Sequence, residues 1–157
     1  MNEEAQQPKA AFYINAQYIK DLSFEAPNSP AIFREQVQPE ISVNLNIEPN
    51  QLEGNVFEIV IKFNIEAKGN DKVAFLLELD HACVCTLNVP PEHVEPMLLI
   101  EIPRFLFPFS RNIIADLTRD GGFPPLMLNP LDFAGLYQQR IQARANAAAN
   151  PVATADS

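Results

Sequence analysis

The sequence is poor in basic residues and in glycine. It has 11 Lys and Arg against 20 Asp and Glu, which gives a formal net charge of −9, and this balance argues against nucleic-acid binding. It has only five glycines, and the phosphate-cradling patterns G-x-x-x-x-G-K-S/T and G-x-G-x-x-G are absent, as is the G-x-S-x-G pattern of serine hydrolases. We therefore expect a protein that is not an enzyme and needs no cofactor.

Long apolar runs are also missing. The most apolar stretch, residues 94–109, is interrupted by charged residues and prolines, so no segment predicts a membrane span and we expect no insertion into a membrane. Residues 1–10 are polar and lack the apolar core of a signal peptide. The chain has only two cysteines and no visible secretion signal, which favours a reducing compartment, and we expect a cytoplasmic protein.

The two cysteines form the only cluster that suggests a metal. His81, Cys83 and Cys85 would share one face of a strand, with His93 downstream as a fourth ligand. The C-x-C spacing departs from the usual C-x-x-C, and no residue is placed to orient a Cys–His catalytic pair. We interpret the cysteines as small apolar residues packed in a sheet or a subunit interface, and we predict no metal site.

Alternating apolar and polar residues predict strands over residues 12–24, 40–48, 56–67 and 72–87. In the second strand, Ile41, Val43, Leu45 and Ile47 alternate with polar residues, which is typical of an antiparallel sheet covered on one face. The strands precede the helices without βαβ alternation. This order predicts an α+β fold in which a four-stranded antiparallel sheet carries two to three helices on one face. We expect the first strand at an edge and the uncovered face to be exposed.

Helices are predicted in the second half of the chain. Residues 92–102 form a short helix, and we expect Pro103 and Pro108 to interrupt the helical segment that follows. Gly121 and Gly122 end that segment, and Asn129-Pro130 begins the last helix. We predict a disordered N-terminus over residues 1–10, one domain over residues 11–144 and a disordered tail over residues 145–157.

Two surface features have more than one interpretation. The loop over residues 123–128 reads Phe-Pro-Pro-Leu-Met-Leu, which is too apolar for a simple surface connection. It either packs on the core or forms an apolar binding surface. On the outer face of the fourth strand, Leu76 lies beside Glu78 and Asp80, an arrangement that suits a contact point, although a lone exposed leucine is the commoner reading.

Four segments together resemble a known family. They are residues 18–28 (Tyr-Ile-Lys-Asp-Leu-Ser-Phe-Glu-Ala-Pro-Asn), 38–40, 107–111 and 122–133, and the similarity covers about residues 12–137. In these segments the chain resembles the bacterial protein-export chaperone family SecB. The resemblance implies an ATP-independent holdase that binds unfolded precursor proteins, keeps them translocation-competent and delivers them to the SecA translocase ATPase. It also implies a homotetramer, built as a dimer of dimers.

The resemblance further implies two sites, carried over residue by residue. The SecA-binding residues would be Asp21, Glu25, Leu76 and Glu78. The groove for unfolded clients would be lined by Ile41, Val43, Leu45, Phe123, Leu126, Leu128 and Phe133. The alternative within the same fold is a SecB-like chaperone dedicated to a toxin–antitoxin system or another specific client. An enzyme of unknown type and a structural oligomer without clients are the other readings.

Overall fold

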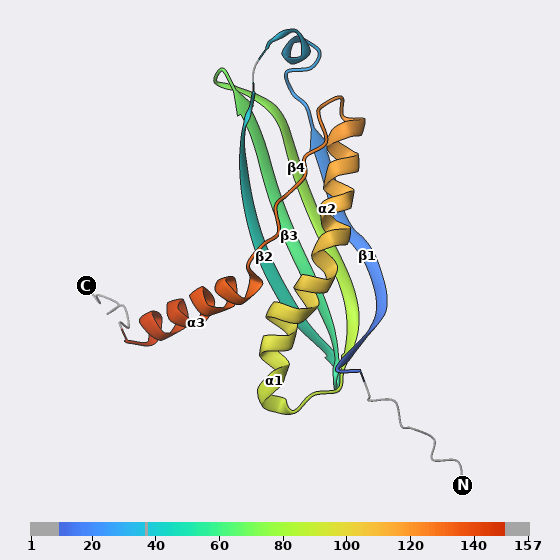
Figure 1. Cartoon of the computed structure of the whole chain (residues 1–157), viewed down its shortest axis with the longest axis vertical. Coiled ribbons are helices and arrows are strands. Elements are labelled where there is room, and N and C mark those ends of the chain that lie inside the picture. The colour runs from blue at the N-terminus through green and yellow to red at the C-terminus, as the bar shows by residue number, and fades with distance from the viewer. Residues whose placement is uncertain (1–9, 37, 150–157) are drawn as a thin grey trace, which may run out of the picture.

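The computed structural model describes residues 10–36 and 38–149. Its largest element is an antiparallel sheet of four strands in the order β1-β4-β3-β2 (Figure 1). The strands are β1 (Phe12–Glu25), β2 (Glu40–Glu53), β3 (Val56–Gly69) and β4 (Lys72–Leu87), and the short helical turn η1 (Ala31–Arg34) joins β1 to β2. The predicted α+β class and the edge position of the first strand are confirmed.

Strand β2 is longer than its sequence pattern predicts. Pro49 and Asn50, which follow the predicted strand of residues 40–48, lie within β2 and pair with Ile59 and Glu58. Proline lacks an N–H, so it fits a strand whose outer side pairs with no other strand, and β2 is the edge opposite β1. Gly54, at φ 55°, makes the tight turn to β3 instead.

The helical half begins with α1 (Pro91–Pro96), continues through the π-helical segment η2 (Met97–Glu101) into α2 (Ile102–Asp120), and ends with α3 (Phe133–Ala149). Pro103 directly follows η2, at the start of α2, so the α-helical pattern is interrupted before this proline while the helical backbone continues. The predicted interruption at Pro108 is wrong, because α2 continues through it. Pro108 itself is exposed, whereas its neighbours Leu106, Phe107 and Ser110 are buried, and their packing offsets the cost of about 3 kcal/mol for an internal proline.

Helix α2 lies along one face of the sheet, which we call the helix-side face, and the core fills the space between them (Figure 1). The fully buried side chains come from both layers: Ile59, Ile61, Phe63 and Ile65 of β3, Leu77 and Leu79 of β4, and Ile102, Leu106 and Ile114 of α2. Helix α3 projects away from the sheet (Figure 1), and only its first residue, Phe133, is buried in the core. The core therefore holds α2 firmly and leaves most of α3 exposed.

The opposite face, which we call the outer face, is only partly exposed. Val60 and Ala82 are 2% and 0% exposed, so the expectation of an exposed outer face is wrong for these residues. Tyr18 lies beside Ala82 in the register of β1 and β4, and its hydroxyl donates to Glu58 of β3. Polar side chains from neighbouring strands therefore cover the small residues at the centre of this face.

The ends of the chain fall largely outside the described residues. Helix α3 continues to Ala149, so residues 145–149, which the sequence analysis places in the tail, are helical. Residues 1–9 and 150–157 lie outside the described part, and the expectations for them stay predictions. Within the described residues, no helix is both long and apolar enough to cross a membrane.

Candidate functional site

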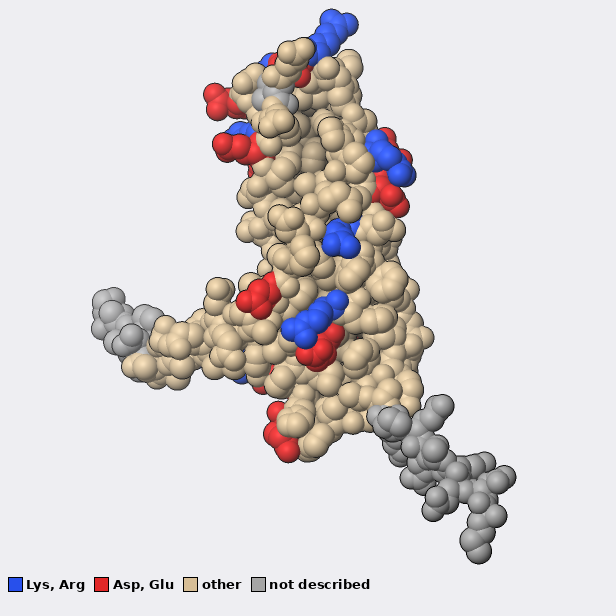
Figure 2. Space-filling model, in the orientation of Figure 1, with Lys and Arg blue, Asp and Glu red and all other residues tan. Residues whose placement is uncertain are grey.

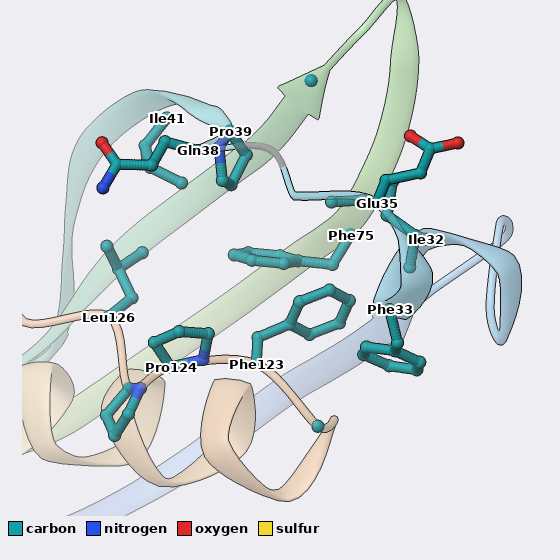
Figure 3. A pocket seen from close by; sticks show the side chains of 14 residues that line it. Ile32, Phe33, Glu35, Gln38, Pro39, Ile41, Phe75, Phe123, Pro124 and Leu126 are labelled. Atoms are coloured by element: carbon teal, nitrogen blue, oxygen red, sulfur yellow. The ribbon is translucent and has the colours of Figure 1, made fainter.

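An apolar cavity of about 470 Å³ opens between η1, the Gly69 end of the sheet and the loop that follows α2 (Figure 3). The rings of Phe33, Phe75 and Phe123 lie close together on one side, while Ile41 and Leu126 lie on the other (Figure 3). The cavity is therefore built from three parts of the chain that are far apart in the sequence.

The end of α2 fixes the loop that forms this cavity. Gly122 has a φ of 92°, a conformation that favours glycine, and the N–H of Phe123 donates to the carbonyl of Thr118 at 3.1 Å. The buried Thr118 hydroxyl donates to the carbonyl of Ile114 at 2.9 Å and accepts the N–H of Leu126, also at 2.9 Å. The sequence analysis missed Thr118; its signal is a polar residue on the apolar face of a helix.

Aromatic contacts hold Phe123 at the wall of the cavity. Its ring centroid lies 5.1 Å from Phe33, 5.1 Å from Phe75 and 6.3 Å from Phe24. Phe123 and Leu126 pack against the core and also line the cavity, while Met127 in the same loop is 63% exposed. The loop therefore packs on the core and also presents apolar surface. That this surface binds a partner stays a prediction.

Only some of the predicted groove residues line the cavity. Ile41, Val43 and Leu45 all point to the helix-side face, since they pair with Ala67, Ile65 and Phe63 of β3. Ile41, Phe123 and Leu126 line the cavity together, and the structure adds Ile32, Phe33 and Phe75, which the sequence analysis did not single out.

The other predicted groove residues lie farther along or deeper. Leu45 lines a second hollow of about 260 Å³ with Leu136, Tyr137 and Arg140. The guanidinium of Arg140 donates to the carbonyl of Ile47 at 3.2 Å, which ties α3 to the edge of β2. Leu128 is half-buried, and Phe133 is 2% exposed, so Phe133 lies beneath the surface.

The helix-side face carries few charges. Figure 2 shows this face formed mostly by residues other than Lys, Arg, Asp and Glu. One ion pair stands at the cavity, where the ammonium of Lys72 lies 2.8 Å from the carboxylate of Glu35. The hydrogen bond from Lys72 lowers the pKa of Glu35 below its usual value, so this carboxylate stays charged at neutral pH.

The predicted partner-binding residues come together on the outer face. Glu25 of β1 pairs with Leu76 of β4, and Asp21 pairs with Asp80, two positions along β4 from Glu78. We call Asp21, Glu25, Leu76 and Glu78 the acidic patch. It lies on the opposite side of the sheet from the cavity, so the two surfaces are separate.

The histidine and cysteine cluster is buried against α2. Cys83 and Cys85 are free thiols on the helix-side face, and burial raises their pKa to about 12 and about 11. His81 is buried too, with its Nδ1 2.6 Å from the hydroxyl of Ser110. Across residues 10–36 and 38–149, no group of three His, Cys, Asp or Glu residues could hold a metal ion. Protonated, buried thiols fit the interpretation of packing residues.

The family model and the relatives that match this chain carry the same family name. Residues 3–144 match the family described as "Preprotein translocase subunit SecB". The "Protein-export protein SecB" of Rhodospirillum rubrum is 51% identical over 160 residues, covering 99% of this chain and 100% of the relative. The proteins of that name from Paramagnetospirillum magneticum and Zymomonas mobilis are 52% and 49% identical, covering 81% and 82% of this chain and 83% and 79% of the relatives.

A solved structure has the same fold. It is a SecB-like chaperone of Mycobacterium tuberculosis in complex with a peptide from an antitoxin, with a TM-score of 0.61 over 77% of this chain and 91% of that chain. Its sequence is 16% identical, so this similarity shows the fold alone.

Proposed function

The chain belongs to the SecB family of protein-export chaperones, and from that premise we propose that it is an ATP-independent holdase that delivers unfolded precursor proteins to the SecA translocase ATPase. Relatives named for protein export are about half identical over almost the whole chain. The antitoxin-bound chaperone shares only the fold. The comparisons therefore favour export over a dedicated role in a toxin–antitoxin system.

The observation that carries the client site is the open, aromatic-lined cavity. An apolar segment of an unfolded chain gains about 25 cal/mol for each Å² of apolar surface that it buries there. A folded protein keeps such segments in its own core. The chaperone therefore binds the unfolded state selectively and holds it by mass action, without nucleotide and without bond chemistry.

We propose that clients contact Ile41, Phe123 and Leu126 first, because these predicted groove residues line the cavity together. Val43 and Leu45 continue the same row along β2 toward the second hollow. This row is suited to an extended segment, whose side chains would occupy successive positions. Phe133 is buried in the core, where it packs edge-on against Phe107 at a centroid distance of 5.8 Å, and it lines neither the cavity nor the second hollow.

SecA would bind the acidic patch on the outer face. The patch joins three carboxylates and the half-buried Leu76 on two neighbouring strands, so it offers both charge and an apolar contact. A basic partner surface would be attracted to it, and the charges would set the orientation of docking. Because the cavity lies on the other side of the sheet, client and SecA can be bound together.

We also propose that the chain assembles as a homotetramer, built as a dimer of dimers, and that it works in the cytoplasm. Exposed apolar side chains occur on both β1 and α2, namely Ile19, Leu22, Phe105 and Phe109. Contacts between copies would remove this surface from water. Several cavities in one assembly would also hold a long client at several points, which raises the overall affinity.

The test compares substitutions in the cavity with one outside it. Ile41→Asp and Leu126→Asp place a charge in the cavity, and we expect about tenfold weaker binding of an unfolded precursor without nucleotide, measured by calorimetry. Leu52→Asp is the control, because Leu52 is an exposed apolar residue at the far end of β2. Native mass spectrometry checks that each variant keeps the wild-type assembly. Undiminished binding by both cavity variants would contradict the client site.

A further inference from the structure

Strand β1 contains two β-bulges, and the side chain of each extra residue makes a hydrogen bond to a neighbouring strand. The register with β4 shifts between Ile14 and Ala16 and again between Ile19 and Asp21, so Asn15 and Lys20 are the extra residues. The amide of Asn15 donates to the Thr86 hydroxyl at 2.9 Å. The ammonium of Lys20 donates to the two carboxylate oxygens of Glu58 at 2.9 and 3.2 Å.

The second bulge determines which way Asp21 points. Ile19 pairs with His81 on the helix-side face, and the extra residue Lys20 lets Asp21 pair with Asp80 on the outer face. Regular alternation from Ile19 would turn Asp21 to the helix-side face, because neighbouring strand residues point to opposite faces. Beyond the bulge, Leu22 and Phe24 return to the helix-side face opposite Leu79 and Leu77.

Packing of Phe24 against the core and the ring of Phe75 fixes the register beyond the bulge but not the position of the bulge. If the bulge moved by one residue, Lys20 would pair with Asp80 and Asp21 would become the extra residue. That arrangement would pair the positive Lys20 with the negative Asp80. The observed register instead pairs the carboxylates of Asp21 and Asp80, and like charges at paired positions are destabilising. Lys62 relieves this repulsion only at a distance, with its ammonium 3.9 Å from Asp80.

Glu58 holds Lys20 away from Asp80. Its carboxylate is on β3, is 9% exposed and accepts hydrogen bonds from the Tyr18 hydroxyl, from Lys20 and from the Asn50 amide. The bonds from Tyr18 and then Lys20 lower its pKa, so it stays ionised. A partly buried carboxylate with fixed partners attracts Lys20 more strongly than the more exposed Asp80 does.

We propose that Lys20, held by Glu58, is a positioning residue for the acidic patch: the ion pair fixes the second bulge of β1 and so keeps Asp21 on the outer face. This inference rests on the proposed docking of SecA at that patch. Lys20 would then favour the binding of a basic partner surface although it carries a positive charge itself. Charge attraction alone predicts the opposite effect.

Removing the charge of Lys20 tests the inference, because positioning and charge attraction predict opposite changes in the affinity for SecA. Lys20→Met removes a positive charge beside the patch, so electrostatic attraction alone predicts equal or tighter binding of SecA. Positioning predicts that the affinity falls at least about threefold, measured by calorimetry with the full chain. Lys72→Met is the matched control, because Lys72 also pairs with a less exposed carboxylate, that of Glu35, but lies outside the bulges of β1 and away from Asp80. We expect equal or tighter binding for this variant.

Two further measurements separate positioning from general damage. Lys20→Met should keep the binding of unfolded precursor, and its cross-strand nuclear Overhauser contacts should show Asp21 displaced from Asp80. Lys20→Arg should restore both SecA affinity and that pairing. Unchanged or tighter SecA binding by Lys20→Met would overturn the inference.

A substitution within the patch distinguishes the inference from the proposed function. If Glu78→Lys weakens SecA binding and Lys20→Met does not, only the positioning role fails. If Glu78→Lys also leaves SecA binding unchanged, the docking site itself is wrong, and the positioning role falls with it.

Discussion

At the scale of single residues, buried polar side chains link α2 to the sheet and to the loop. Thr118 joins the helix to Leu126, and Ser110 joins it to His81 of β4. Each of these groups has a hydrogen-bond partner, which lowers the cost of burying it. His81 differs from the others because its charge can change near neutral pH.

The His81 imidazole gives a pH dependence with a defined sign. Burial lowers its pKa below the ordinary value of about 6.5, so the unfolded chain takes up a proton more readily than the folded one. Its contribution to the free energy of unfolding is therefore complete above about pH 6.5 and is lost as the pH falls below that value. Urea unfolding at pH 7.5 and 5.5, at fixed protein concentration, should show a larger loss for the wild type than for His81→Gln. Equal losses would contradict this account.

At the scale of elements, the end of α2 sets the shape of the cavity. Gly121 and Gly122 stop the helix and direct the next six residues back across the helix-side face. A Cβ on Gly122 would lie 2.9 Å from the ring of Phe33, in addition to the strain of a φ of 92°. Gly122 therefore both ends α2 and leaves room for the ring of Phe33 at the cavity.

Substitution of Gly122 should affect stability and client binding together. We expect Gly122→Ala to lower the free energy of unfolding by about 1–2 kcal/mol, the usual cost of a left-handed conformation with a Cβ. It should also weaken binding of unfolded precursor, because Phe33 must move. Gly54→Ala is the control, since Gly54 has a φ of 55° and no atom within 4 Å of the added Cβ. That variant should lose stability and bind clients normally; equal client binding by both variants would show that Phe33 does not shape the site.

The elements also show what could be predicted from the sequence. Alternation located the strands, and the glycine pair located the end of α2, because these are local patterns of residues. The extension of β2 through Pro49 and the passage of α2 through Pro108 could not be predicted, since sheet position and packing decide them. The same holds for the bulge at Lys20 and for Phe33, whose roles depend on Glu58 and Phe123, partners far along the chain.

At the scale of the whole molecule, the sheet separates two surfaces of different chemistry. The helix-side face carries the apolar cavity, and the outer face carries the acidic patch. The proposed client site and the proposed SecA site therefore lie on different faces. A change on one face should leave the other function intact.

Charge reversal in the patch tests this separation. We expect Glu78→Lys to weaken SecA binding about tenfold, because it replaces attraction with repulsion at a docking surface, and to leave binding of unfolded precursor unchanged. Glu53→Lys is the control, since Glu53 is an exposed residue near the Gly54 turn, away from the patch. Calorimetry with SecA and with precursor measures both affinities. A parallel loss of precursor binding would show that the two faces are not independent.

As a holdase, the chain should bind unfolded polypeptide and not folded protein. The direct measurement is calorimetric titration of the full chain, without nucleotide, with one precursor in a permanently unfolded form and in its folded form. We predict tight binding of the unfolded form and none of the folded form. Equal binding of both forms, or binding of neither, would contradict the account.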